Sequence, residues 1–192
     1  MIWNRHLDLE GSHAFLSASK YNWINYDEEK IKETYKNHLR TLLGTELHEM
    51  AAMLIKHKTK LPDEPVTLNM YVNDAIDFGL SPEVVLRYSE FCFGTADAIN
   101  YQSGELRIHD LKTGITPAHI EQLQIYAALF CLEYGYKPSD IHTVLRLYQS
   151  NEIFEMEPQA DDILPIMSKI IRFDEILTEI KQSKEGYTSW AN

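Results

Sequence analysis

The spacing of hydrophobic residues changes along this chain, and each change predicts a different element. Apolar residues three or four positions apart indicate helices, whereas short β-branched and aromatic runs between turn residues indicate strands. Helices are predicted over 27–58, 68–78, 117–134 and 161–182. Strands are predicted within 83–101 and over 105–111, 141–148 and 153–156. This order predicts one α/β domain of the mixed (α+β) type over residues 1–192, with a central mixed β-sheet flanked by helices.

Capping residues and an apolar stripe describe the first helix further. Asp27 is expected to cap its N-terminus, and Gly135 is expected to end the third helix. Gly44 lies within the first helix, where glycine favours a bend. Apolar residues at spacings of three and four are expected to face the core: Leu39, Leu43, Leu47, Met50 and Leu54. Residues 1–26 have no such period and are predicted to be irregular.

The segment Ile108–Gly114 carries the most informative chemistry, because an acid and a lysine stand two residues apart at the end of a predicted strand. Side chains in a strand alternate between faces, so Asp110 and Lys112 are expected to project from the same side. Gly114 then lets the chain turn away. A strand end of this kind suits a metal on the acid and a phosphate or an attacking water on the lysine. The alternative is a solvated strand pair.

A second acid, Asp97, lies in the β-prone segment one hairpin before Asp110. Adjacent antiparallel strands would bring the two positions within several ångströms of each other. Two carboxylates at that separation repel unless a divalent cation neutralises them. The alternative is that Asp97 is an ordinary turn aspartate.

Three further features extend this candidate site. His48 lies beside the apolar stripe of the first helix, from where an imidazole could reach a metal. Gln122 and Tyr126 are four residues apart and share one face of the helix after Lys112. Glu90 is an acid within an apolar strand pattern and is a candidate third carboxylate. The alternatives are a structural histidine, a surface glutamine with an interfacial tyrosine, and an outward-facing glutamate.

The distribution of charge along the chain bears on which partners it could bind. The formal net charge is −11, which by itself argues against nucleic acid. The segment 20–60 nevertheless holds eight Lys and Arg against six Asp and Glu, whereas 61–192 holds nine against 21. Lys32, Lys36 and Arg40 recur every four residues and form one cationic helix stripe. The stripe is either a phosphate-tracking surface that binds DNA or a solvated helix face.

Several classes of protein are not expected from this sequence. The N-terminus has no secretory pattern, and no apolar stretch approaches the roughly 20 residues of a membrane helix. Cys92 and Cys131 lie far apart and are expected to be free thiols in the cytoplasm. There is no Gly-x-x-x-x-Gly-Lys motif, so no nucleotide cofactor is expected.

The motifs His48, Asp97, Asp110-x-Lys112 and Gln122-x-x-x-Tyr126, with Glu90 as an optional member, occur in an order that resembles a known family. This order is similar to the RecB-type branch of the PD-(D/E)XK nucleases, and most similar to the phage-encoded exonucleases. The stretch His13–Ser19 followed by Trp23 resembles the N-terminus of that phage group. The resemblance implies a restriction-endonuclease-like core over about 27–150, with the C-terminal helix at about 161–182.

The resemblance also implies a role for each matched position. A Mg²⁺ or Mn²⁺ ion would be held by His48, Asp97, Asp110 and the main-chain carbonyl of Leu111. Lys112 would orient the attacking water or stabilise the charge of the transition state, and Gln122 and Tyr126 would hold the site and the scissile strand. The implied activity is metal-dependent hydrolysis of phosphodiester bonds in DNA, expected as an exonuclease in recombination or repair.

Two departures and several alternatives complete these expectations. The acid of the Asp-x-Lys unit is Asp rather than Glu, as is common in this branch. Many relatives carry four cysteines for an iron–sulfur cluster; two cysteines cannot supply one, so no cluster is expected. The alternatives are a catalytically silent DNA-binding or assembly module and a ribonuclease. A homo-oligomer with cationic faces turned inward, and a recombination partner protein, are further expectations.

Overall fold

The computed structural model describes residue 7 and residues 11–114, 116–117 and 119–183. The chain forms two compact units, Met1–Thr45 and Glu46–Asn192. Every matched motif position from His48 to Tyr126 falls in the second unit.

The N-terminal unit contains the 3₁₀ segment η2 (Ala18–Asn25) and the first part of helix α1 (Glu28–Lys56). The prediction of irregular structure is therefore wrong for residues 18–25, while residues 1–6 and 8–10 lie outside the described part. Trp23 Nε1 donates to the carbonyl of Ser17 at 2.9 Å, a local hydrogen bond that hydrophobic spacing does not reveal. Asp27 Oδ1 accepts from the amide of Lys30 at 2.7 Å, so the predicted N-cap is confirmed.

Helix α1 is continuous through Gly44. The prediction that the whole apolar stripe faces the core is wrong, because Leu39 is 46% exposed and Leu43 is 55% exposed. The buried residues of α1 are Ala51 and Ile55, near its C-terminal end. A helical period shows which residues share a face, but it does not show where along the helix a packing partner lies.

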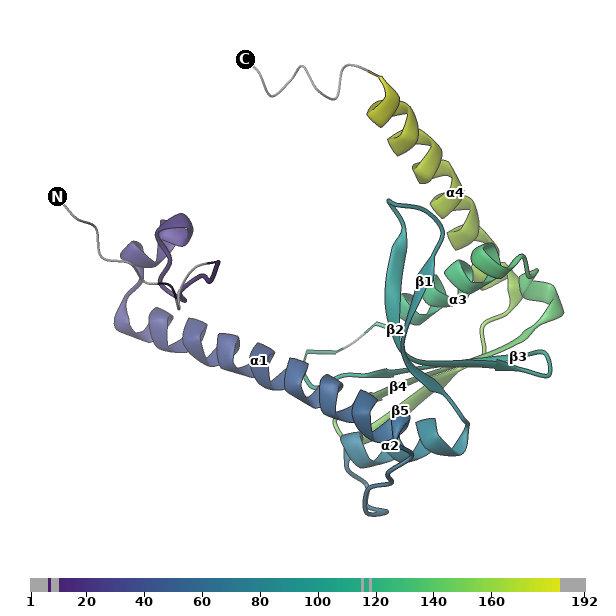
Figure 1. The fold of residues 1–192 in the computed structure, drawn as a ribbon, viewed down its shortest axis with the longest axis horizontal. Coiled ribbons are helices and arrows are strands. Elements are labelled where there is room, and N and C mark those ends of the chain that lie inside the picture. The colour runs from purple at the N-terminus through teal and green to yellow at the C-terminus, as the bar shows by residue number, and fades with distance from the viewer. Residues whose placement is uncertain (1–6, 8–10, 115, 118, 184–192) are drawn as a thin grey trace. The chain divides into compact units, whose positions relative to one another are not determined.

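The second unit is built on a five-stranded sheet in the order β1-β2-β3-β4-β5. Its strands are β1 (Ser81–Arg87), β2 (Phe93–Gln102), β3 (Glu105–Leu111), β4 (His142–Gln149) and β5 (Glu152–Met156). Neighbours are antiparallel except β3 and β4, which are parallel and joined through helix α3 (Glu121–Tyr134). Figure 1 shows that β1 and β2 turn sharply away from the direction of the other three strands. The predicted mixed sheet is confirmed.

Helices cover both faces of this sheet. On one face, α3 and α4 (Ala160–Gln182) pack on residues that include Leu106, Ile108 and Leu145. On the other face, α2 (Thr67–Asp77) and the end of α1 pack on Leu111 and Tyr148. Consecutive positions of β3 thus serve opposite layers, as expected for a strand buried on both faces.

Most predicted boundaries agree with the structure. Gly135 has φ 73° and ends α3 in the left-handed conformation that glycine adopts readily. The β4–β5 hairpin turns at Ser150 and Asn151, as predicted. Helix α3 begins at Glu121 instead of Pro117. Between Pro138 and Asp140 a short 3₁₀ turn, η3 (Pro138–Asp140), leads into β4.

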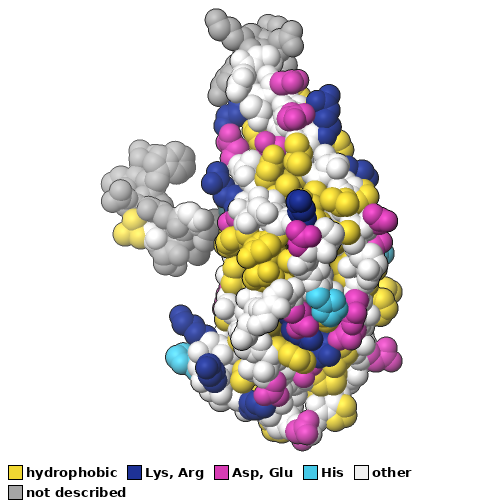
Figure 2. Space-filling view, turned by 90° about the vertical axis from the view of Figure 1, so that its right-hand side faces the viewer, with side chains coloured by type: hydrophobic (Ala, Val, Ile, Leu, Met, Phe, Trp, Pro, Cys, Tyr) yellow, Lys and Arg dark blue, Asp and Glu magenta, His cyan; other side chains and the backbone are white. Residues whose placement is uncertain are grey.

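Helix α4 is amphipathic with a partly open apolar side. Ile163 and Ile170 are buried against the core, while Phe173, Leu177 and Ile180 are exposed. Figure 2 shows hydrophobic side chains gathered on the upper part of the viewed face. Within the described ranges, none of the helices combines the length and apolar character needed to cross a membrane.

Candidate functional site

Asp110 and Lys112 project to the same side of the end of β3, as predicted. Lys112 Nζ lies 2.8 Å from Oδ2 of Asp110 and donates to Oδ1 at 3.1 Å. Asp110 is only 1% exposed, and burial raises the pKa of its carboxyl above the ordinary value. The Lys112 ammonium opposes this rise in pKa, because it stabilises the charged form of the carboxyl.

Helix α3 joins this pair through Gln122 and Tyr126. Lys112 Nζ donates to Oε1 of Gln122 at 2.8 Å, and Gln122 Nε2 donates to the Tyr126 hydroxyl at 3.3 Å. The Tyr126 hydroxyl in turn donates to the carbonyl of Thr95 on β2 at 2.7 Å. A Cβ atom added at Gly94 would lie 3.0 Å from the Tyr126 ring, so glycine makes room for this ring. The predicted i, i+4 pair therefore ties α3 to both β3 and β2.

Asp97 on β2 connects the strands to α1. Its Oδ2 accepts from the main-chain amide of Leu111 at 2.9 Å and lies 3.4 Å from Nδ1 of His48. Burial, and then the charge of Asp110, raise the pKa of Asp97 to about 6, against the opposing effects of Leu111, His48 and Lys112. A positive charge placed beside these two acids would favour the charged forms of both carboxyls.

Glu83 on β1 is a further acid at this site, and the sequence patterns did not indicate it. Ligand atoms of His48, Glu83 and Asp97 all lie within 4.8 Å of one another. Glu83 has φ 55°, whereas the other non-glycine residues with positive φ in the described ranges lie in turns or at a helix end. A strained conformation inside a strand is typical of functional positions. Only the pairing register of β1 and β2 could have placed Glu83 near Asp97.

The backbone of β2 is irregular at the same position. Ala96 packs with the α3 and α4 layer, whereas Ala98 packs with the α1 and α2 layer, although residues two apart in a regular strand share a face. The alternation is therefore interrupted at Asp97, between two alanines that are both fully buried. Irregular strand geometry of this kind commonly re-aims side chains beside active sites.

The donor set at this place suits a hard divalent cation. One imidazole and two carboxylates converge, and Asp110 adds negative charge while its own oxygens contact Lys112. Carboxylate oxygens with a single histidine fit Mg²⁺ and Mn²⁺. The Leu111 main chain contacts Asp97 through its amide; a metal-ligand role for its carbonyl stays a prediction.

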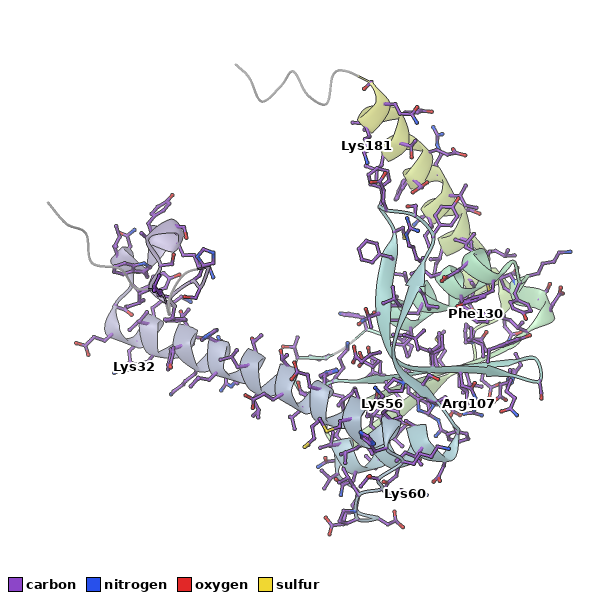
Figure 3. The ribbon with its side chains drawn as sticks, in the orientation of Figure 1. Lys32, Lys56, Lys60, Arg107, Phe130 and Lys181 are labelled. Atoms are coloured by element: carbon purple, nitrogen blue, oxygen red, sulfur yellow. The ribbon has the colours of Figure 1, made fainter. Side chains whose placement is uncertain are left out.

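Glu90 is not brought to this site. The chain leaves β1 at Arg87, and Glu90 lies in the β1–β2 loop, where its carboxylate is 2.5 Å from Nζ of Lys181 on α4. Lys181, labelled in Figure 3, also lies 5.6 Å from the centre of the Phe91 ring. The prediction that Glu90 sits within a strand is wrong, because the amide of Tyr88 already bonds back to the carbonyl of Cys92 and closes the hairpin.

The cationic stripe lies in the N-terminal unit, on α1. Lys32, Lys36 and Arg40 are all exposed. Lys32, labelled in Figure 3, pairs with Glu29 at 2.9 Å, and Arg40 donates to Oδ1 of Asn37 at 2.7 Å. Local partners thus reduce the charge that the stripe offers to phosphates.

In the second unit, Cys92 and Cys131 are both free thiols.

Comparison with known proteins gives little further constraint. No family model matches the chain. The chain is similar to part of the calcium/calmodulin-dependent protein kinase kinase cmkC of Emericella nidulans, with 27% identity over 154 residues. The match covers 78% of this chain and 28% of the kinase kinase, so the chain spans little more than a quarter of that relative.

Proposed function

We propose that this chain is a divalent-metal-dependent nuclease that hydrolyses phosphodiester bonds in DNA, acting as an exonuclease. One observation carries the proposal: Lys112 Nζ lies 2.8 Å from both Asp110 and Gln122, beside the acid pair Asp110 and Asp97. Asp110 and the side-chain amide of Gln122 hold the Lys112 ammonium in place beside the carboxylate of Asp97. A fixed positive charge there is suited to a reaction at phosphorus, because it can stabilise negative charge on a phosphate. The resemblance of the motif order to RecB-type nucleases supports the same activity.

His48, Glu83 and Asp97 would hold the metal ion, with Asp110 contributing charge at the same place. When bound, Mg²⁺ or Mn²⁺ supplies Lewis acidity toward a phosphate oxygen and toward the attacking water. The raised pKa values of Asp97 and Asp110 support this assignment, because a nearby cation would make both carboxyls easier to ionise.

The remaining residues have roles that follow from their hydrogen bonds. Asp110 and Gln122 fix the direction of the Lys112 ammonium, which then orients the water or stabilises negative charge on the phosphate. Gln122 is held by the Tyr126 hydroxyl, which is anchored on the carbonyl of Thr95. The positions of Lys112 and Gln122 are therefore set before any substrate binds, and preorganised groups of this kind lower the activation barrier.

Protein kinase activity, which the name of the similar fungal protein raises, has less support. Kinases hold Mg²⁺ with an Asp-Phe-Gly motif and cover ATP with a Gly-x-Gly-x-x-Gly loop. The string Asp77-Phe78-Gly79 occurs here, but Asp77 ends α2 and its carboxylate pairs with Lys60 at 2.5 Å. The chain has no Gly-x-Gly-x-x-Gly string. We therefore propose no phosphate transfer from ATP.

The proposal is tested with linear DNA labelled at the 5′ or the 3′ end, circular DNA and RNA, each incubated with Mg²⁺, Mn²⁺ or EDTA. We expect metal-dependent loss of linear DNA from an end, no cleavage of circles, and no activity in EDTA. Cleavage of RNA alone would favour the ribonuclease alternative. DNA binding without cleavage in either metal would favour the catalytically silent module, and both results contradict the proposal.

A further inference from the structure

The hairpin of β1 and β2 has one face turned to the core and one face turned to solvent. Val84, Leu86 and Ala96 pack into the layer formed with α3 and α4. On the opposite side, Val85 is 56% exposed, Phe93 is 63% exposed, and Arg87 and Thr95 are also exposed. We call the four residues Val85, Arg87, Phe93 and Thr95 the outer face.

Strand register connects the outer face to the candidate metal ligands. Val85 is paired with Thr95 and Arg87 with Phe93. Glu83 and Asp97 stand opposite each other between the pairs Pro82–Ala98 and Val84–Ala96. The pairs Val85–Thr95 and Arg87–Phe93 therefore lie on the solvent-facing side of the hairpin, and the two acids come next along both strands, at the irregular pair. At about 3.3 Å per residue, the four-residue step from Asp97 to Phe93 spans about 13 Å.

The chemistry at the far end of the outer face suits a nucleic acid strand. Arg87 makes no ion pair with any described residue through its guanidinium; only its main-chain amide is engaged, by Glu133 at 2.7 Å. By contrast, Lys181 of α4, the cation that contacts the β1–β2 loop, is paired with Glu90. An available guanidinium directly across from an exposed phenyl ring combines a phosphate contact with a stacking platform, the pair of features that single-strand binding uses.

We propose that the outer face binds the single DNA strand that leads into the catalytic site, with a base stacked on Phe93 and a phosphate on Arg87. This inference rests on the proposed nuclease function. A stacked strand rises about 3.4 Å per nucleotide, so the base on Phe93 would be about four nucleotides from the scissile phosphate, and fewer in an extended strand. The strand then passes Val85 and Thr95 before it reaches the acids.

Binding of a fluorescent single strand about 12 nucleotides long tests the stacking contact, by anisotropy in Ca²⁺ without Mg²⁺ or Mn²⁺. Phe93→Ala should weaken binding about 5- to 100-fold, and Phe93→Trp should restore it. Phe91→Ala is the matched control, because Phe91 lies two residues away but contacts Lys181 instead of the outer face. Equal unfolding midpoints of all variants exclude a folding defect.

Salt dependence tests the phosphate contact. Arg87→Gln should reduce the slope of log K against log salt by about 0.7, the value for one phosphate contact on a single strand. The control is Arg172→Gln, since Arg172 is exposed on α4 and pairs with Glu175. A set of strands, each with one abasic nucleotide at a different position, locates the stacked base. One position should weaken binding to the wild type, and an abasic nucleotide at that position should not weaken binding to Phe93→Ala further.

The outcomes separate the two proposals. If the wild type cleaves DNA but Phe93→Ala and Arg87→Gln bind it as the wild type does, the outer face is not the strand track and the nuclease function stands. If the wild type binds the strand with these dependences but never cleaves, the outer face is a single-strand binding surface without a catalytic site, and the nuclease proposal fails. A phenotype of Phe93→Ala confined to binding of another protein would make the outer face a protein interface and overturn the track.

Discussion

Glu83 and Asp97 face each other across β1 and β2, and each offers a carboxylate oxygen within 4.8 Å of a His48 ring nitrogen. Both strands are irregular at this pair: Glu83 has φ 55°, and the side-chain alternation of β2 is interrupted at Asp97. The two irregularities turn two acids from neighbouring strands toward one imidazole. A positive φ at a glutamate inside a strand is a strained conformation, and such strain is often found at functional sites.

Glu83→Gln should therefore lower the affinity for Mn²⁺ by at least about tenfold, because removing a metal-site group typically has such an effect. The matched control is Glu90→Gln, which removes a carboxylate that pairs with Lys181 away from the site. Calorimetric titration of both variants measures the difference. Equal Mn²⁺ affinity of the wild type and Glu83→Gln would remove Glu83 from the ligand set.

The variant Glu83→Gly distinguishes the effect of backbone strain at position 83 on stability from the role of the Glu83 carboxylate in metal binding. Glycine adopts positive φ without a steric penalty, although it loses more backbone entropy on folding. We expect the metal-free variant to be as stable as the wild type or more stable by up to about 1 kcal/mol, while its Mn²⁺ affinity falls. Thermal unfolding in EDTA measures the first effect. A clear loss of stability would show that Glu83 supports the fold rather than being strained in it.

Lys112→Gln and Asp110→Asn should each reduce metal-dependent cleavage on the order of 100-fold or more, because each removes charge from the group that acts on the phosphate. Lys169→Gln, on α4, is the control that removes one positive charge elsewhere. Single-turnover cleavage of labelled linear DNA measures the effect. Full activity in either site variant would contradict the site assignment.

His109 predicts a pH dependence of stability. It is fully buried, the Tyr148 hydroxyl donates to Asp74 at 2.7 Å, and Nδ1 of His109 lies 3.2 Å from that hydroxyl. Burial, and then the charges of Arg146 and Arg107, lower the pKa of His109 to about 3. Because the Tyr148 hydroxyl uses its proton on Asp74, it can only accept from His109, so Nδ1 of the neutral ring carries the proton. Nε2 has no hydrogen-bond partner within the described part of the chain.

Because the folded-state pKa of His109 lies below the unfolded value of about 6.5, protons bind the unfolded chain more readily. The stability due to neutral His109 is fully present above pH 6.5 and is lost progressively as the pH falls toward about 3, at up to about 1.4 kcal/mol per pH unit. Urea unfolding in EDTA across this range should show a shallower dependence in His109→Asn than in the wild type. Parallel curves would contradict the assignment.

The cationic stripe on α1 predicts a salt effect on DNA binding. Replacing Lys32, Lys36 and Arg40 together with Gln should weaken binding and reduce the salt slope by about 0.7–0.9 for each phosphate that the variant no longer binds. We expect this number to be below three, because Lys32 is paired with Glu29. The control replaces Lys56, Lys58 and Lys60, the three lysines that follow on α1 and beyond it; Figure 3 labels the first and last of these. An unchanged slope in the stripe variant would make the stripe a solvated helix face.

Local sequence determined the elements and part of the site, because these depend on neighbours along the chain. The cap at Asp27, the turn at Ser150 and Asn151, and the shared side of Asp110 and Lys112 all follow from backbone geometry within a few residues. The i, i+4 pair of Gln122 and Tyr126 follows in the same way.

Tertiary structure alone decided which distant residues meet. Glu83 reaches Asp97 and His48 through strand register, and Glu90 points to α4 because the chain leaves β1 three residues earlier. A shift of one residue in register would turn each side chain to the other face, and no local pattern specifies that register at an irregular strand pair. Likewise, the period of α1 showed a common face, but only packing in one cluster with α2, Leu111 and Tyr148 decided that Ala51 and Ile55 are buried.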